Sequence, residues 1–339
     1  MKIAIHSRKD SFSDRWIDYC RKNNVNYRVV DCYKSDIIDQ MSDCDGLMWH
    51  WMQDDPKAKL FARQLSYSLE SIGKKMFPDS KTCWHFDDKI GQKYLLEALD
   101  APLVPTYIFY DRNEALKWVG KTHFPKVFKL STGAGSANVR LAKDQKEAIR
   151  LINTAFGKGF APVSSYTNDY KTKIKKISSG KAFIDKLKRL PTSIRTIRYA
   201  NRYLGREKGY AYFQDFIPEN DHDIRIIVIG RRAFAIKRLV RDGDFRASGS
   251  GQFIHDPDQI PRKCITIAFE LSAELKSQCM TYDFVFKGKT PLIVEISYGF
   301  IKEVYDPCPG YWDQDLNWID GAFNAQYFMV EDFMRSLDK

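Results

Sequence analysis

The first 80 residues alternate between short apolar segments and longer amphipathic ones, and this alternation constrains the fold more than any other feature. The apolar segments have the length of buried strands and cover residues 2–6, 27–31, 46–51 and 75–77. Residues 13–23 and 57–72 have the apolar spacing of helices. Strands and helices in alternation form a parallel sheet covered by helices. We therefore predict a small parallel α/β domain over residues 1–86.

The remainder of the chain predicts a less regular mixture, so the fold class is α/β (α+β). We expect a helix over residues 87–99 capped by Asp87, and another that begins at Asp144 with Glu147 in a capping-box position. The expected strands cover residues 126–130, 137–141, 210–216, 224–229, 233–239, 284–286 and 292–296, and a helix covers residues 260–278. The predicted boundaries are a lid subdomain at 87–210 and a C-terminal subdomain at 211–339.

Length and cysteine usage narrow the class of protein. A chain of 339 residues suits two or three lobes that share interfaces. The seven cysteines are scattered and form no CxxC pair, which predicts reduced thiols, a cytoplasmic protein and no zinc site. We find no signal-peptide pattern at the start and no apolar run long enough to span a bilayer.

The net charge of +11 is concentrated in one segment. Residues 171–208 contain thirteen Lys or Arg and two acids, so this basic segment alone accounts for a charge of +11. The first interpretation is a solvated helical face. The second is a docking surface for an anionic carrier or for the inner face of a membrane. Nucleic acid ranks third, because the segment has few aromatic residues on which bases could stack.

A lysine followed by a glycine-rich loop is the first feature that indicates chemistry. Lys129 ends an expected strand and is followed by a loop whose small residues include Ser131, Gly133, Gly135 and Ser136. Such a loop lets backbone N–H groups approach a phosphate, since glycine leaves no side chain in the way. Most loops of this composition are only hairpin turns, so the motif needs support from elsewhere in the chain.

That support comes from charged residues within apolar strands. Lys237 and Arg238 end one such strand, where they either meet anions or lie exposed at the strand end. Asp283 and Glu295 lie on two apolar strands about a hairpin apart. Magnesium takes oxygen ligands from one or two carboxylates and completes its shell with phosphate and water. A cross-strand lysine partner would explain either acid singly but explains both less well.

The ordered set of these elements, over residues 77–297, resembles the ATP-grasp superfamily, which includes D-alanine–D-alanine ligase, glutathione synthetase and the ribosomal-protein glutamate ligases. The resemblance implies an ATP-grasp fold that follows the N-terminal α/β domain. It also implies that Lys89, Lys129 and Lys237 bind phosphate. Gln214, Asp215, Phe216 and Ile217 are similar to the hinge that binds adenine, and Asp223 resembles the acid that binds the ribose. Asp283 and Glu295 match the carboxylates that hold two Mg²⁺ ions.

The sequence departs from the family pattern at three places. Ser297 stands where the last metal motif usually has Asn, so the second metal ion would be held differently. Thr281 stands where members often have an Arg that stabilises the oxyanion. Residues 244–251 are similar to the "F-R-x-N" loop of the glutamate-ligase branch, with Ser248 in place of Asn. Arg246 and Arg238 are therefore the candidates for the oxyanion role.

The resemblance implies an ATP-dependent ligase that joins a carboxylate to an amine through an acyl-phosphate. The aromatic segment at residues 305–318 either packs on the core or stacks against a substrate. It also resembles ATP-grasp proteins of bacterial surface-polysaccharide pathways. This resemblance suggests that the carboxylate substrate is a sugar acid or a peptide and that the amine substrate is an amino acid or another amine. The rival functions are a catalytically silent ATP-binding protein and a phosphotransferase. The sequence does not reveal the oligomeric state.

Overall fold

The computed structural model describes residues 1–52, 55–133, 138–161, 205–241 and 243–338. Its first sheet has the order β2-β1-β3-β4, and every neighbouring pair is parallel. The elements of this part of the chain are β1 (Ile3–His6), α1 (Phe12–Lys22), β2 (Tyr27–Val30), α2 (Ile37–Gln40), β3 (Gly46–Met48), α3 (Pro56–Ser71), β4 (Lys75–Phe77) and α4 (Ser80–Cys83). The predicted parallel α/β sheet at the N-terminus is confirmed.

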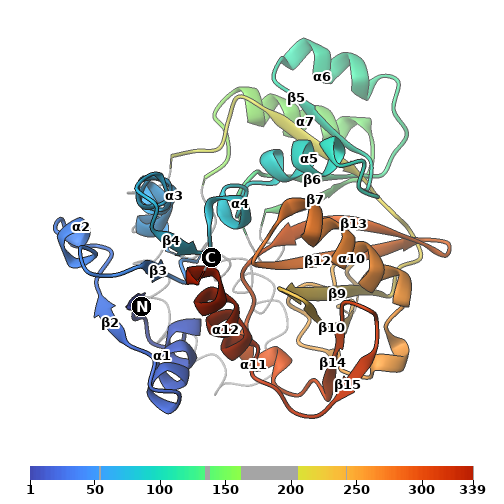
Figure 1. Ribbon diagram of the computed structural model, residues 1–339. Coiled ribbons are helices and arrows are strands. Elements are labelled where there is room, and N and C mark those ends of the chain that lie inside the picture. The colour runs from blue at the N-terminus through green and yellow to red at the C-terminus, as the bar shows by residue number, and fades with distance from the viewer. Residues whose placement is uncertain (53–54, 134–137, 162–204, 242, 339) are drawn as a thin grey trace, which may run out of the picture.

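The second sheet is antiparallel, with the order β5-β8-β6-β7. Together with its helices it forms the upper lobe in Figure 1, which we call the lid. The elements of the lid are α5 (Lys89–Ala98), β5 (Thr106–Phe109), α6 (Arg112–Val119), β6 (Lys126–Lys129), β7 (Val139–Ala142), α7 (Gln145–Phe156) and β8 (Ala211–Asp215). Helices α6 and α7 bury their apolar faces on this sheet, where Ala115 and Ile152 share a core with Phe128 and Phe213.

The third and largest sheet follows the path β13-β12-β9-β10-β14-β15, and β11 pairs with β10. Its strands are β9 (His222–Ile229), β10 (Arg232–Leu239), β11 (Phe253–Ile254), β12 (Cys279–Lys287), β13 (Thr290–Ser297), β14 (Gly310–Asp313) and β15 (Trp318–Asp320). The helical elements are η1 (Pro257–Gln259), α10 (Arg262–Leu275), α11 (Lys302–Tyr305) and α12 (Ala325–Leu337). Helix α10 covers one face of the sheet, where Ile265 and Ala268 share a core with Ile226 and Tyr282.

The N-terminal sheet and the largest sheet share one hydrophobic core. Ile5 and Phe12 belong to the same buried cluster as Ile227, Phe234 and Phe333 of the C-terminal half. Helix α12 lies between the N-terminal elements and the largest sheet in Figure 1 and contacts α1, β4 and β9. The two parts are also joined by an ion pair, because the Arg15 guanidinium on α1 donates to both carboxylate oxygens of Asp306, at 2.7 and 2.6 Å. This shared core fixes the first domain against the sheet that carries much of the site described below.

The aromatic segment after residue 304 packs on the core, as one of the two interpretations predicted. The ring of Tyr305 lies 5.3 Å from that of Phe300, and the rings of Trp312 and Trp318 are 4.7 Å apart. Strands β14 and β15 extend the largest sheet, and α12 follows them. The sequence analysis predicted neither the two strands nor this helix.

Two further predictions need correction. Asp88, not Asp87, caps the helix after residue 87: its carboxylate accepts from the backbone N–H groups of Ile90 and Gly91, at 3.2 and 3.1 Å. Asp87 instead has a left-handed backbone with φ of 53°. Strand β12 begins at Cys279, five residues before the predicted start at residue 284.

Strand β8 pairs within the lid sheet, although the predicted boundary at 210/211 assigned it to the C-terminal subdomain. The predicted subdomain boundaries stay a prediction. Residues 171–204, which hold most of the basic segment, lie outside the described residues, so its docking role also stays a prediction.

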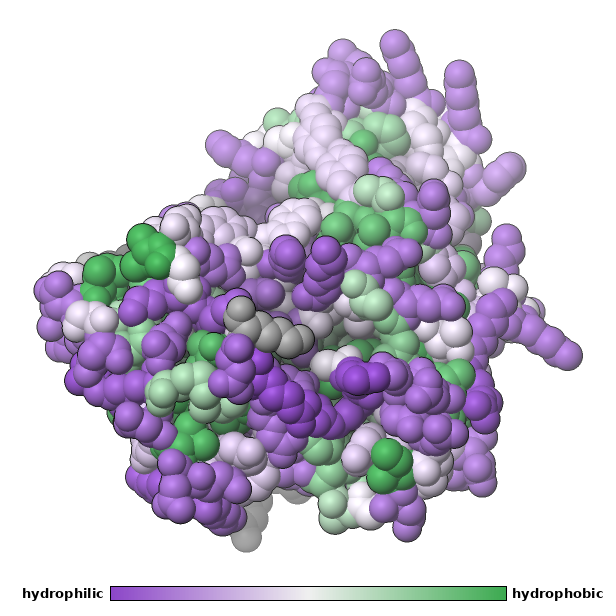
Figure 2. Space-filling view, viewed as in Figure 1, coloured by the Kyte–Doolittle hydropathy of each residue, from purple (hydrophilic) through white to green (hydrophobic). Residues whose placement is uncertain are grey.

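All seven cysteines are free and buried. Among the described residues, no helix combines the length and apolar character needed to cross a bilayer. Hydrophilic side chains cover most of the face shown in Figure 2.

Candidate functional site

A cavity of ≈380 Å³ lies between the lid sheet and the largest sheet and gathers most of the predicted site residues. Apolar side chains from both sheets line it, among them Val127 and Val139 from the lid and Val285 and Val294 from the largest sheet. The predicted site residues that line it are Lys89, Lys129, Gly133, Gln214, Asp215, Phe216, Ile217, Asp223, Arg238, Arg246, Asp283, Glu295 and Ser297. Gly135 and Ser136 lie outside the described residues.

Two buried lysines reach the cavity from the lid. The Nζ of Lys89, at the start of α5, donates to the carbonyl of Gly133 at 2.8 Å and lies 3.1 Å from Glu295 Oε1. Burial opposes the charge of Lys89, but the carboxylates of Glu295 and Asp87 outweigh it, so its pKa is raised. Lys129, at the end of β6, donates to the carbonyl of Val294 at 3.5 Å. Burial lowers the pKa of Lys129 to about 8, against the opposing effect of Glu295. Both amines are thus held where an anion would stabilise their charged form.

Asp283 and Glu295 lie directly opposite each other on the neighbouring strands β12 and β13. The pairing register shifts immediately after Asp283, which marks an irregularity between these strands beside the two acids. The adjacency that the sequence predicted is therefore present. Two carboxylates side by side at a cavity that also holds two lysines suit Mg²⁺ bound together with phosphate, since protein carboxylates supply only part of its shell. Among the described residues, no cluster of three or more His, Cys, Asp or Glu could hold a metal ion by itself.

Two arginines bind the acids of the largest sheet. Arg225 on β9 donates to both oxygens of Asp283, at 2.5 and 2.6 Å, and Arg238 Nη2 lies 2.9 Å from the same carboxylate. Arg238 also donates to both oxygens of Asp223, at 2.6 and 2.7 Å. Burial raises the pKa of Asp223. Burial acts in the same direction on Asp283, but the two guanidinium groups outweigh it and hold the pKa of that carboxyl well below its usual range. Asp283 is therefore ionised at neutral pH, as a metal ligand must be.

Lys237 does not line the cavity. Side chains alternate between the two faces of a strand, so on β10 Ile236 and Arg238 face the cavity and Lys237 faces away from it. Its Nζ lies 3.4 Å from Gln259 Oε1, outside the cavity. Of the two cations at this end of β10, Arg238 lines the cavity and Lys237 does not.

The predicted hinge comprises the last two residues of β8 and the two residues that follow it. The side chain of Gln214 donates to Thr106 Oγ1 at 3.0 Å, and Asp215 accepts from Lys126 Nζ at 2.5 Å. These contacts tie both side chains to neighbouring strands of the lid sheet. Phe216 and Ile217 line the cavity immediately after the strand. Such a connection between the two sheets can present its backbone to a flat ring, which is the geometry that the predicted adenine site requires.

The remaining predicted residues have local partners. Ser131 Oγ donates to Asp88 at 2.9 Å, and Ser131 does not line the cavity. Ser297 Oγ accepts from the N–H of Gly299 at 3.1 Å and donates to its carbonyl at 3.2 Å, so this hydroxyl closes a turn beside Glu295. Arg246 binds the carboxylate of Asp244 through Nε and Nη2, with the closest contact at 2.5 Å.

A family model described as the RimK-like ATP-grasp domain matches residues 200–300. This stretch contains the hinge, the arginine pair and both carboxylates. The chain has the ATP-grasp fold, and residues 200–300 are similar to the RimK-like ATP-grasp domain. A search of curated proteins found no match.

Solved structures share this fold over nearly the whole chain. A RimK domain protein of Sphaerobacter thermophilus is 15% identical, with a TM-score of 0.55 and coverage of 98% of this chain and 99% of that one. A D-alanine–D-alanine ligase of Bacillus anthracis, also solved in complex with ATP, is 12% identical, with a TM-score of 0.57 and coverage of 100% and 99%. The ligase PsnB, in complex with precursor, Mg and ADP, is 10% identical, with a TM-score of 0.55 and coverage of 100% and 98%. At these identities the likeness shows the fold.

The sequence analysis missed Arg225, which lines the cavity. A cation inside the apolar run of β9, next to Ile224 and Ile226, is the same signal that singled out Arg238. It marks a buried charge that needs a carboxylate partner, here Asp283.

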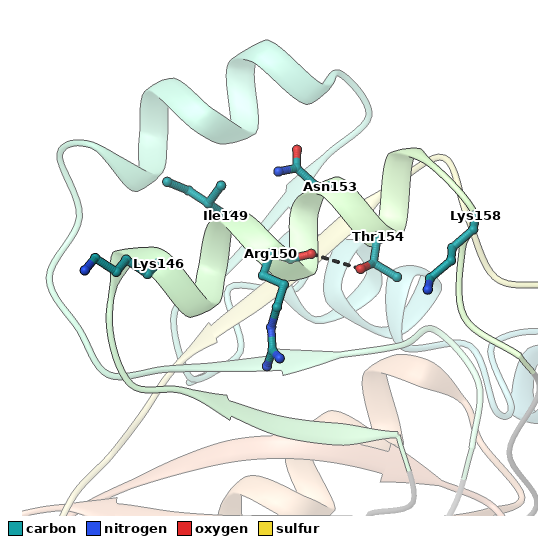
Figure 3. Close-up of a pocket in the computed structure, with 6 residues that line it drawn as sticks. All are labelled: Lys146, Ile149, Arg150, Asn153, Thr154 and Lys158. Carbon is teal, nitrogen blue, oxygen red and sulfur yellow. Dashed lines mark hydrogen bonds between the residues drawn. The ribbon is translucent and has the colours of Figure 1, made fainter.

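A second hollow, of ≈530 Å³, lies on the outer side of the lid along α7 (Figure 3). Lys146, Arg150 and Lys158 are the cations that line it, and Figure 3 shows their side chains pointing in different directions. Because these cations do not converge on one point, this hollow has no geometry for a bound anion. We therefore place the candidate site in the smaller cavity between the two sheets.

Proposed function

We propose that this protein is an ATP-dependent, Mg²⁺-requiring carboxylate–amine ligase that forms an amide and releases ADP and phosphate. One observation carries the proposal: two buried lysines of the lid, Lys89 and Lys129, meet two adjacent carboxylates, Asp283 and Glu295, in a single cavity. Structures of the same fold in complex with ATP, and with Mg and ADP, support the choice of nucleotide and metal.

The residues of the cavity would have separate roles in binding and catalysis. Lys89 and Lys129 would neutralise phosphate oxygens, and Asp283 and Glu295 would hold one or two Mg²⁺ ions, with Ser297 beside them. ATP would supply the phosphoryl group that converts an unreactive carboxylate into an acyl-phosphate. Residues 214–217 would hold the adenine base. Asp223, which accepts a hydrogen bond from Arg238, would also contact the ribose. Arg238 and Arg246 would stabilise the oxyanion that forms when the amine attacks.

Other lining residues of the cavity suit the substrates. Phe253, Phe300, Ile301 and Val304 line the same cavity as Arg246. An aromatic and aliphatic wall beside a guanidinium group suits a molecule with one apolar face and one carboxylate. A sugar acid presents both, and so does a peptide terminus. We propose that one of these is joined to an amino acid or amine, as in bacterial surface-glycan biosynthesis.

The test is release of ADP and phosphate from Mg-ATP across a panel of uronic acids, peptides, amino acids and amino sugars. The proposed function predicts release that depends on one acid and one amine, together with a product whose mass equals that of the amide. Glu295→Gln should abolish the release, whereas Glu270→Gln, on the exposed side of α10, should leave it unchanged.

The same assay separates the rival functions. A phosphorylated product without an amide would replace the ligase by a phosphotransferase. Tight nucleotide binding with no release for any substrate of the panel would favour the silent ATP-binding protein. Lys237→Met should retain activity, because Lys237 faces away from the cavity. Loss of activity in this variant would restore the role that the family resemblance implied for it.

A further inference from the structure

All the backbone polar groups of residues 131–133, the described start of the glycine loop, are bound by other parts of the protein. The N–H groups of Ser131 and Thr132 donate to the carboxylate of Glu207 at 3.0 and 3.3 Å, and that of Gly133 donates to Asp87 Oδ1 at 2.7 Å. The three carbonyls accept from the N–H of Lys89, the amide of Asn138 and the Nζ of Lys89. Two protein carboxylates therefore bind the amides that the sequence assigned to a phosphate.

The two carboxylates differ in position. Asp87 lines the cavity and Glu207 does not, so Glu207 holds the loop from behind while Asp87 holds it from the side where a nucleotide would enter. The backbone of Glu207 is fixed by two hydrogen bonds to Phe160, both 2.9 Å long. Its place behind the loop is thus part of the lid framework.

The carboxylate of Asp87 binds the N–H of Gly133, where a phosphate could bind. Its side chain is buried, it accepts from Gly133, and its charge is one of those that act on Lys89. Lys59 on α3 of the N-terminal domain pairs with its other oxygen. An N–H of a glycine loop together with a nearby lysine is the donor set that a phosphate group uses. Asp87 therefore holds one donor that a phosphate needs, the N–H of Gly133, while Lys89 binds the carbonyl of the same residue.

The backbone of Asp87 is also unusual. A φ of 53° is the left-handed region, which costs free energy for residues other than glycine and is best tolerated by Asn and Asp. The strained conformation directs this carboxylate toward the loop instead of toward the helix N-terminus that Asp88 caps.

We propose that Asp87 is a positioning residue that competes with the nucleotide phosphates for the N–H of Gly133 and repels them by its negative charge. The inference rests on the proposed function, since it assumes that the cavity binds ATP. Lys59 compensates the charge of Asp87, so this pair sets how strongly the cavity favours a polyphosphate. It also connects the glycine loop of the lid to α3 of the N-terminal domain.

The test compares the affinities of AMP, ADP and ATP for the full-length protein and three variants by titration calorimetry. Asp87→Asn keeps the left-handed backbone and an oxygen acceptor but removes the charge. We expect it to bind ADP and ATP about tenfold more tightly. The interaction energy of two unit charges a few ångströms apart near a protein surface is larger than the free energy that a tenfold change in affinity requires. AMP affinity should change less than about twofold, because AMP lacks the outer phosphates.

Lys59→Met should act with the opposite sign and weaken ADP and ATP binding, because it leaves the charge of Asp87 uncompensated. Glu207→Gln should not tighten ATP binding, because its carboxylate lies outside the cavity. Asp87→Gly, which also accepts a positive φ, repeats the test if the Asn variant does not fold.

Weaker ATP binding by Asp87→Asn, or an equal change for AMP and ATP, would overturn the competition. It would show that Asp87 is only a brace for the loop. If the wild-type protein binds none of the three nucleotides, the proposed function and this inference fall together. If ATP binds but the Asp87 and Lys59 variants bind it as the wild type does, only the inference falls.

Discussion

Lys129 should destabilise the folded protein at neutral pH, and replacing it with Met should reveal by how much. Its side chain is buried at the end of β6, and burial lowers its pKa from 10.5 to about 8. The two values differ by about 2.5, and each unit corresponds to about 1.4 kcal/mol, so the buried charge costs about 3 kcal/mol at pH 7. We expect Lys129→Met to raise the free energy of unfolding by about this amount.

The pH dependence gives the sign of the effect. Below pH 8 the lysine is protonated in both the folded and the unfolded chain, so the full cost is present. Between about pH 8 and 10.5 the unfolded chain binds more protons than the folded one, and the stability of the wild type therefore rises with pH. The advantage of the Met variant should shrink over this range. Urea unfolding at pH 7, 8, 9 and 10 measures it.

A matched control separates this effect from the general consequences of losing a lysine. Lys117→Met, on the exposed side of α6, should change the free energy of unfolding by less than about 0.5 kcal/mol at every pH. Lys129→Met should also lose affinity for ATP, because the amine is one of two that the cavity offers to phosphate. A variant that is less stable than the wild type at pH 7, or a gain that stays constant up to pH 10, would refute the reasoning.

Two other perturbations follow from the geometry of the site. Asp283→Asn leaves the buried Arg225 with a neutral partner and removes one of the two carboxylates that bind Arg238, so thermal unfolding should show a loss of about 3–5 kcal/mol. The low pKa of Asp283 stabilises the fold above about pH 4, and this contribution disappears as the pH falls. The acid-induced loss of stability should therefore be less steep in the variant. Gly133→Ala places a Cβ 2.5 Å from Asn138 Nδ2 at a φ of 115°, so it should weaken ATP binding by about 1–3 kcal/mol. Gly73→Ala is the control: its φ is 80° and its Cβ would have nothing within 4 Å, so it should leave ATP binding unchanged in the same titration.

The sequence predicted best those features that depend on local pattern. The strand and helix alternation of the first 80 residues led to the parallel sheet, because short apolar runs such as β1 are buried on both faces, although the edge strand β2 is only partly buried. The pairing of Asp283 with Glu295 could also be predicted, since both lie on apolar strands that a tight turn at residues 288–289 joins. In both cases neighbours in the chain become neighbours in space.

The sequence failed where orientation decides the role of a residue. Lys237 and Arg238 are adjacent on β10, so they must face opposite ways, and both neighbouring positions of the strand are apolar. Only the placement of the lid over one face of the sheet shows which cation reaches the cavity. Asp87 and Asp88 present the same difficulty. Asp87 has a left-handed backbone, so Asp88 caps the helix, and no local sequence pattern predicts this conformation.

The charges of the cavity explain why nucleotide and metal should bind together. Each carboxylate expected to hold metal already has a cation, Glu295 with Lys89 and Asp283 with two arginines. Phosphate alone would draw Lys89 from Glu295 and leave that partly exposed carboxylate without its partner. Mg²⁺ alone would draw Glu295 away and leave the buried amine of Lys89 without its partner. Mg²⁺ and phosphate together exchange one set of pairs for another, since the carboxylate turns to the metal and the amine to the phosphate. The affinity for ATP should therefore rise with Mg²⁺ concentration in the wild type, and Glu295→Gln should reduce this dependence because one of the two exchanged pairs no longer exists.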